Sequence, residues 1–161
     1  MQGEGSGKTP TESAVEMTEM VLPNDANPHG NVLGGKVMYF VDLAGAMAAH
    51  RHSHRAVVTA SMDGMKFLHG VKVGQILIVR AQVNRAFNTS MEVGVEVFSE
   101  DIHTGERQRT GAAFLTYVAM DAQGRPTPVP VIIPQTPEEQ DRYNEAGLRR
   151  SARLGDERKD L

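Results

Sequence analysis

A long apolar segment with almost no charge is the feature that most restricts how this chain can fold. Apolar side chains recur at spacings of three and four over residues 34–50, which predicts a helix. Apart from Lys36, the only ionisable side chains in this segment are those of Tyr39, Asp42 and His50. A helix on an exterior surface would carry a broad charged face. We therefore expect the rest of the protein to wrap around this helix.

Segments with strand character flank the helix. One strand is expected before it, and the sequence predicts four after it; the expected ranges are 15–22, 56–67, 75–83, 91–97 and 110–120. The range 91–97 is the clearest, because every second residue in it is apolar. Residues 101–106 have the composition of a hairpin turn. No second helix alternates with the strands, so an α+β fold is predicted, with one antiparallel sheet wrapped around one helix.

Composition excludes several classes of protein. The chain has 161 residues, no cysteine and a net charge of -3, and only 5% of its residues are aromatic. Disulfides, thiolate zinc sites and a cysteine nucleophile are therefore excluded. Binding to nucleic acid would need clustered cations or stacking aromatic side chains. No apolar run approaches the ~20 residues of a membrane span. We expect a cytoplasmic protein with no nucleic-acid or membrane partner.

The two ends of the chain differ in composition from its middle. Residues 1–13 are polar and Gly-rich and predict a disordered leader. Residues 14–122 predict the folded domain. Residues 123–161 begin with a Pro-rich segment and continue as a charged stretch that opens on Pro137 and acids and ends among arginines, which is typical of a helix.

Asp42 and Asn31 are the candidate catalytic residues. Asp42 lies at or beside the apolar face of the predicted helix, where an ionised carboxylate needs partners; a carboxylate at the edge of that face is an equally good interpretation. Asn31 precedes the helix, where a cap is the commonest use of Asn. Gly34 and Gly35 leave the first helical amides open to a ligand oxygen. Because eleven residues separate Asn31 from Asp42, the two side chains meet more readily between the copies of a symmetric dimer.

A metal site is not expected. His50, His52 and His54 alternate just after the apolar segment. They stand where the helix ends, and cationic side chains are favoured at a helix C-terminus. No cysteine or well-placed carboxylate completes a ligand set around them.

Three segments of the chain resemble hotdog-fold acyl-CoA thioesterases, the cytosolic acyl-CoA hydrolase family. They are residues 27–38 (NPHGNVLGGKVM) with Val41-Asp42, residues 58–63 (VTASMD) with Phe67, and residues 85–93 (RAFNTSMEV). The resemblance covers about residues 15–120 and implies the hotdog fold, in which a curled antiparallel sheet wraps one long central α-helix. It implies hydrolysis of acyl-CoA to a fatty acid and coenzyme A. The catalytic pair of the family falls on Asn31 and Asp42, which meet across subunits.

The same resemblance implies how substrate is bound and how the copies assemble. Coenzyme A would run along Ala60-Ser61-Met62 and Thr89-Ser90-Met91, its phosphates would meet Arg149 or Arg150, and the amides of Gly34 and Gly35 would polarise the carbonyl oxygen. Homodimers, assembled further into a hexameric trimer of dimers, are implied. No cofactor is expected, since coenzyme A is part of the substrate. Two other functions stay open: a non-catalytic acyl-CoA-binding module, and an acyl-thioester dehydratase, which would want a catalytic His near the central helix.

Overall fold

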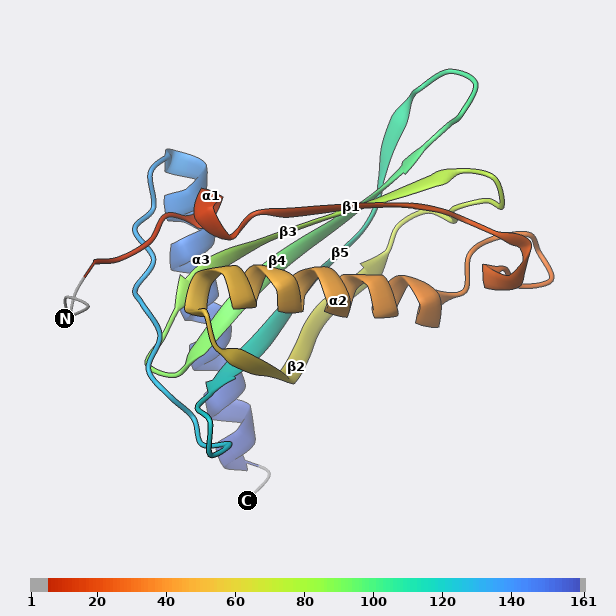
Figure 1. The fold of residues 1–161 in the computed structure, drawn as a ribbon. Coiled ribbons are helices and arrows are strands. Elements are labelled where there is room, and N and C mark those ends of the chain that lie inside the picture. The colour runs from red at the N-terminus through yellow and green to blue at the C-terminus, as the bar shows by residue number, and fades with distance from the viewer. Residues whose placement is uncertain (1–5, 160–161) are drawn as a thin grey trace.

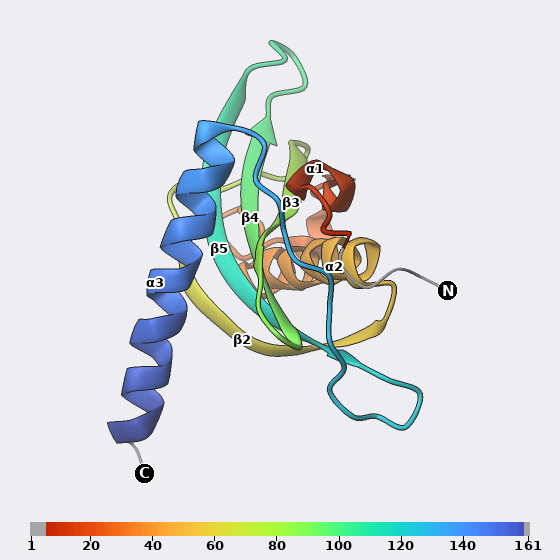
Figure 2. The same ribbon diagram turned by 90° about the vertical axis from the view of Figure 1, so that its left-hand side faces the viewer.

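The computed structural model describes residues 6–159 and contains one curved antiparallel sheet with a long helix on each face. The elements are α1 (Pro10–Ser13), β1 (Val15–Met20), η1 (Pro23–Asp25), α2 (Gly34–Ser53), β2 (Ala56–Phe67), β3 (Ile76–Ala86), β4 (Ser90–Glu100), β5 (Arg107–Met120) and α3 (Pro137–Lys159). Figure 1 shows the sheet curving around α2, and Figure 2 shows α3 crossing the opposite face. The α+β fold with a wrapped central helix is confirmed.

The sheet has the order β1-β3-β4-β5-β2, and all its neighbouring strands are antiparallel. Strands β1 and β2 are therefore the two edges. The pairing of β2 with β5 shifts register between Thr59 and Ser61 and again between Asp63 and Lys66. Such bulges bend a strand and increase its twist. They contribute to the curvature that brings β2 and β5 around the side of α2.

Helix α2 packs on the concave face of the sheet through small side chains. Val41, Ala44, Ala48 and Ala49 are fully buried and meet a layer of inward-facing strand residues that includes Val79, Val83, Val93, Leu115 and Tyr117. Small residues on the helix let the sheet approach closely. The helix ends later than expected, because Ser53 and then His54, in a left-handed conformation with φ 52°, complete its last turn. No helix in residues 6–159 is long and apolar enough to span a membrane.

The prediction of a disordered leader needs correction within the described residues. Pro10–Ser13 form α1, and Ser13 is fully buried. The Ser13 hydroxyl accepts a hydrogen bond from the Val83 amide at 2.9 Å and donates one to the Pro10 carbonyl at 2.6 Å. The backbone of Lys8 forms an isolated parallel β-bridge with Ile132 of the Pro-rich segment. The polar composition of this segment concealed two tertiary contacts; residues 1–5 of the predicted leader lie outside the described part.

Candidate active site

Asp42 lies mid-way along α2, and its side chain is held by the sheet. The Thr59 hydroxyl donates to Asp42 Oδ1 at 2.8 Å. The Tyr117 hydroxyl lies 2.9 Å from the same oxygen and 2.9 Å from the Asp42 carbonyl oxygen. Thr59 and Tyr117 are paired neighbours on β2 and β5, so the sheet register places both donors together. Among the described residues, no group donates to Asp42 Oδ2.

Tyr117 is suited to be a permanent donor to this carboxylate. Its side chain is fully buried. Burial, followed by the hydrogen bond and the charge of Asp42, raises the pKa of the Tyr117 phenol well above its ordinary value. The phenol therefore stays protonated throughout the physiological pH range and can donate to Asp42. The site thus holds one oxygen of the carboxylate in place and leaves the other accessible.

The loop before α2 is organised by Asn27. The Asn27 side-chain Oδ1 accepts hydrogen bonds from the backbone amides of His29 at 3.0 Å and Asn31 at 3.1 Å. The backbone amide of Asn27 donates to the Asn31 carbonyl oxygen at 2.8 Å. The Asn31 side chain instead packs against Gly70; a Cβ built there would lie 2.9 Å from Asn31 Cγ. Both asparagines line a cavity of about 310 Å³, together with Val37, Phe67, Val97 and Thr110.

The first turn of α2 presents open backbone amides beside this cavity. Leu33, the residue before the helix, makes no side-chain cap. Within the described residues, the amides of Gly34 and Gly35 have no acceptor. A Cβ built on Gly35 would meet nothing within 4 Å, whereas one on Gly34 would lie 3.5 Å from the ring of Phe67. Such amides can bind a carbonyl oxygen that gains negative charge.

One chain does not bring the two halves of the predicted site together. Asp42 is eight residues beyond Gly34 on a continuous helix, which corresponds to about 12 Å along the helix axis. A carbonyl oxygen held at the Gly34 amide would therefore be too far away for Asp42 of the same chain to act on its carbon. That two copies build the site stays a prediction.

The residues predicted to bind coenzyme A lie in two different settings. On the edge strand β2, Ala60 stands at the bulge, and the Ser61 hydroxyl is buried without a hydrogen-bond partner in the described part of the chain. Met62 packs against the core from the same strand. These placements leave the backbone of β2 open along the sheet edge, while the roles of these residues stay predictions.

The second predicted segment lies at the start of β4. The carbonyl of Thr89 accepts the Ala119 amide at 2.9 Å, and that of Ser90 accepts the Phe87 amide at 2.8 Å. Met91 is fully buried in the core. The Met91 side chain thus contributes to packing, whereas the side chains of Thr89 and Ser90 are half-buried and their roles toward a ligand stay predictions.

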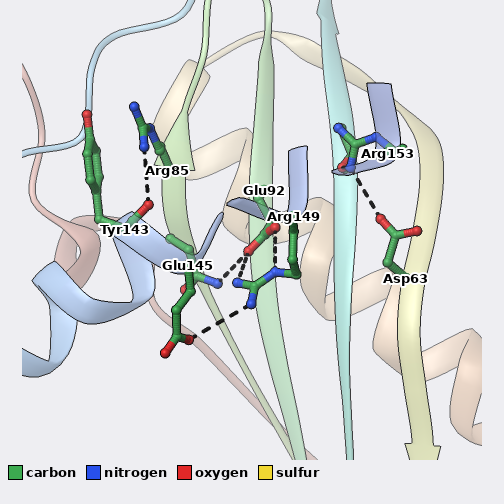
Figure 3. A network of polar contacts seen from close by, with 9 residues as sticks. Asp63, Arg85, Glu92, Tyr143, Glu145, Arg149 and Arg153 are labelled. Carbon is green, nitrogen blue, oxygen red and sulfur yellow. Dashed lines mark hydrogen bonds and ion pairs between the residues drawn. The ribbon is translucent and has the colours of Figure 1, made fainter. Parts of the chain in front are cut away.

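Arg149 and Arg150, the predicted phosphate ligands, face different surroundings on α3. Arg149 donates to both carboxylate oxygens of Glu92, at 3.0 and 2.7 Å, and its guanidinium lies 3.6 Å from the centre of the Phe114 ring. Figure 3 shows this pair beside a second contact from α3 to the sheet. Arg150 stacks on Phe87 and makes no ion pair with a described residue. Of the two arginines, Arg150 is the freer to meet an anion.

Known proteins resemble this chain in sequence and in structure. The profile of the Thioesterase superfamily matches residues 29–106. A Bacillus subtilis protein named as an uncharacterized acyl-CoA thioester hydrolase is 40% identical over 142 residues, which is 88% of this chain and 83% of that protein. The chain belongs to the thioesterase superfamily. Its sheet and central helix are those of the hotdog fold.

Two solved thioesterase structures are similar over nearly the whole chain. An apo-hexameric acyl-CoA thioesterase has a TM-score of 0.88 and 41% identity, covering 91% of this chain and 94% of its own. An acyl-CoA hydrolase from Staphylococcus aureus, in complex with butyryl coenzyme A and coenzyme A, has a TM-score of 0.87 and 34% identity and covers 95% of both chains. The Staphylococcus aureus protein was also solved with an Asp, a Thr or an Asn replaced by Ala.

Sequence reasoning singled out Asp42 as a candidate but missed the residues that contact its side chain. Thr59 and Tyr117 lie 17 and 75 positions away along the chain, so no local pattern connects them to Asp42. An inward-facing hydroxyl on an otherwise apolar strand was the one available signal. Asn27 was hidden among the turn-forming residues of its loop.

Proposed function

We propose that this thioesterase-superfamily protein hydrolyses the thioester of acyl-CoA to a carboxylic acid and free coenzyme A. The observation that carries the proposal is the setting of Asp42, whose Oδ1 is held by Thr59 and Tyr117 while Oδ2 stays open. Oδ2 takes a proton from a water as that water attacks the thioester carbonyl carbon. The tetrahedral intermediate then expels the coenzyme A thiolate, which recovers a proton. This scheme uses no cofactor.

The oxygen of the tetrahedral intermediate needs donors, and the first turn of α2 offers them. Gly34 and Gly35 present amides without acceptors in the described chain. Losing one such donor typically costs about 3 kcal/mol of barrier. The side-chain NH₂ of an asparagine in the preceding loop completes this group in our proposal.

Two asparagines compete for that role. In the Staphylococcus aureus protein the substituted Asp and Thr are 17 positions apart, which equals the separation of Asp42 and Thr59. The substituted Asn there precedes the Asp by 15 positions, which is the spacing of Asn27 from Asp42 and differs from that of Asn31. We therefore propose Asn27 for the role that the sequence assigned to Asn31, and we assign Asn31 to supporting the loop through Gly70.

A second copy completes the site in this proposal. Strand β2 is an open sheet edge, and large apolar side chains are exposed along it and on α2: Met38, Tyr39, Leu43, Val58 and Phe67. Pairing two such edges would bury these side chains and would bring α2 of one copy beside that of the other. The loop of one copy would then face Asp42 of its partner. A trimer of such dimers, and a cytoplasmic location, stay predictions.

No observation favours the alternative functions. A dehydratase would need an imidazole near the reacting carbon, but His50 lies in the last turn of α2 and its Nδ1 is 2.8 Å from the Arg55 carbonyl oxygen. A binding module would not need the open oxygen on Asp42. Neither alternative predicts a release of free thiol that depends on Asp42.

The test is release of free thiol from acyl-CoAs of graded chain length. Asp42→Ala and Asn27→Ala should each lower kcat about 100-fold or more, and Asn31→Ala should lower it less. Isotopic oxygen in the water should enter the acid in the first turnover; label appearing first on Asp42 would indicate a covalent anhydride. Near-normal turnover by Asp42→Ala would refute the proposal.

The two-copy site has its own test. After subunit exchange at equal amounts, half of the dimers should contain one Asp42→Ala chain and one Asn27→Ala chain, and each should hold one intact site of two. We expect recovery of about a quarter of wild-type activity. An inactive mixture whose chains have exchanged would show that each chain carries its own complete site.

A further inference from the structure

The Tyr117 hydroxyl lies against α2 at Gly45, where the helix has no side chain. Tyr117 comes from β5 and is fully buried, so its ring has no freedom to turn toward solvent. A Cβ built on Gly45 would overlap the hydroxyl oxygen and would lie 3.1 Å from two ring carbons. Gly45 is buried on the sheet-facing side of α2, three residues after Asp42. The hydroxyl therefore occupies the volume where any other residue at position 45 would have its side chain.

A glycine in this position weakens the helix. Glycine inside a helix is less favourable than alanine by about 1 kcal/mol, and neighbouring positions Ala44, Ala46, Ala48 and Ala49 carry alanine. Packing of an apolar ring alone would be served by phenylalanine at 117, which needs less room. The combination of Gly45 with a phenol is explained by the contacts of the hydroxyl with Asp42, at its carbonyl oxygen and at Oδ1.

The hydrogen bonds to Oδ1 hold the Asp42 carboxylate in one orientation. Oδ1 accepts from Thr59 at 2.8 Å and lies 2.9 Å from the Tyr117 oxygen. The Thr59 proton goes to Oδ1, and the single Tyr117 proton is shared between Oδ1 and the Asp42 carbonyl oxygen. Turning the carboxylate away from these hydroxyls would break both side-chain contacts, so the other oxygen, Oδ2, stays on the open side. Catalytic groups must be held within a fraction of an ångström of their productive position, and small displacements lower rates severely.

We propose that Tyr117 is a positioning residue for hydrolysis, which holds Asp42 through Oδ1 so that Oδ2 faces the water, and that Gly45 is the residue that admits its hydroxyl. This inference rests on the proposed function of Asp42. Burial and the neighbouring carboxylate raise the pKa of the phenol, which keeps it a donor at every pH at which the enzyme would work. Tyr117 itself does not touch the substrate.

The first test is Tyr117→Phe, which removes only the hydroxyl. Because the lost hydrogen bond is one to a carboxylate, we expect kcat to decrease about 10- to 100-fold. KM should change by less than about twofold, since Tyr117 does not touch the substrate. Tyr143→Phe is the matched control: Tyr143 lies on α3, and no described residue hydrogen-bonds its hydroxyl. It should retain wild-type kcat. A kcat for Tyr117→Phe within about twofold of wild type would overturn the proposal.

A second measurement separates positioning from general damage to the fold. In an Asp42→Ala background there is no carboxylate to position, so Tyr117→Phe should change the residual rate by less than about twofold. Equal decreases in both backgrounds would mean that the hydroxyl acts on the fold and not on Asp42. If Asp42→Ala itself is fully active, the proposed function fails; if only Tyr117→Phe is fully active, this inference fails alone.

Gly45→Ala tests the other half of the proposal. The added methyl should displace the hydroxyl and lower kcat about tenfold or more in the wild-type background. With Phe at 117 the overlapping oxygen is absent, so Gly45→Ala should have a much smaller additional effect on kcat. Equal effects of Gly45→Ala in the two backgrounds would contradict the assigned role of Gly45.

Discussion

Arg149→Ala would test whether Arg149 anchors α3 to the sheet or binds substrate. In the structure, the Arg149 guanidinium donates to both oxygens of Glu92 and lies on the Phe114 ring. The side chain of Glu92 is only 4% exposed, and its other partner is the Asn84 amide at 3.0 Å. Truncation of Arg149 would leave a nearly buried carboxylate with a single neutral donor (Figure 3).

The size of the effect follows from this burial. Removal of one partner from a buried ion pair costs about 3–5 kcal/mol. The Arg149 side chain is 26% exposed, so water can enter where it was, and we expect a loss of about 2–3 kcal/mol in unfolding free energy. For a chain of this length each kcal/mol lowers Tm by about 2–4 °C. Arg149→Ala should therefore melt about 4–12 °C below wild type.

Urea unfolding and thiol release, measured on the same preparations, give the decisive comparison. Adding Glu92→Gln to Arg149→Ala removes the stranded charge and should restore more than half of the lost stability. Arg150→Ala is the matched control, since Arg150 stacks on Phe87 without a carboxylate; it should lose less than about 1 kcal/mol. KM for acyl-CoA should rise in Arg150→Ala only. An unchanged Tm with a raised KM in Arg149→Ala would refute this reasoning.

Two further predictions concern stability. Burial chiefly lowers the pKa of His52, whose Nε2 lies 2.6 Å from the Pro130 carbonyl oxygen. The unfolded chain therefore binds a proton below pH 6.5 that the folded chain resists, so the unfolding free energy should fall as pH drops, by up to about 1.4 kcal/mol per pH unit. His52→Gln should show a smaller decrease in Tm between pH 7.5 and 5.5, and parallel curves would contradict it. Ser13→Ala leaves the buried Val83 amide without an acceptor and should cost about 1–3 kcal/mol in urea unfolding; a change below about 0.5 kcal/mol would show that another group replaces the hydroxyl.

The elements of the fold were largely predictable because their patterns are local. The apolar spacing that predicts a helix over residues 34–50 corresponds to α2, and the range predicted for β2 agrees with the structure at both ends. The C-terminal end of α2 was missed because His54 ends the helix in a left-handed conformation, which a histidine at this position does not predict. Residues 6–13 were missed because the partner of Ser13 is Val83, 70 positions away.

The site was predictable only in part, for the same reason. Asp42 is visible from the sequence because a carboxylate among apolar helical residues is unusual. Its partners Thr59 and Tyr117 depend on the register of β2 against β5, which follows from the bulges and not from either strand alone. The Arg149–Glu92 pair joins positions 57 apart, and nothing in the sequence around Arg149 distinguishes it from Arg150.

The sheet order also determines when the site can form during folding. Strand β2 follows α2 directly in the chain, yet within residues 6–159 it pairs in the sheet with β5 alone, which is made after β3 and β4. Closing such a long loop has an entropic penalty that slows folding, and contacts of this kind form late. While the chain is being synthesised, β2 remains an unpaired strand that exposes apolar residues to other chains. The Thr59–Asp42–Tyr117 contact can be complete only after β5 has docked, so activity should appear only after that step and after the pairing of two copies that the proposed site requires.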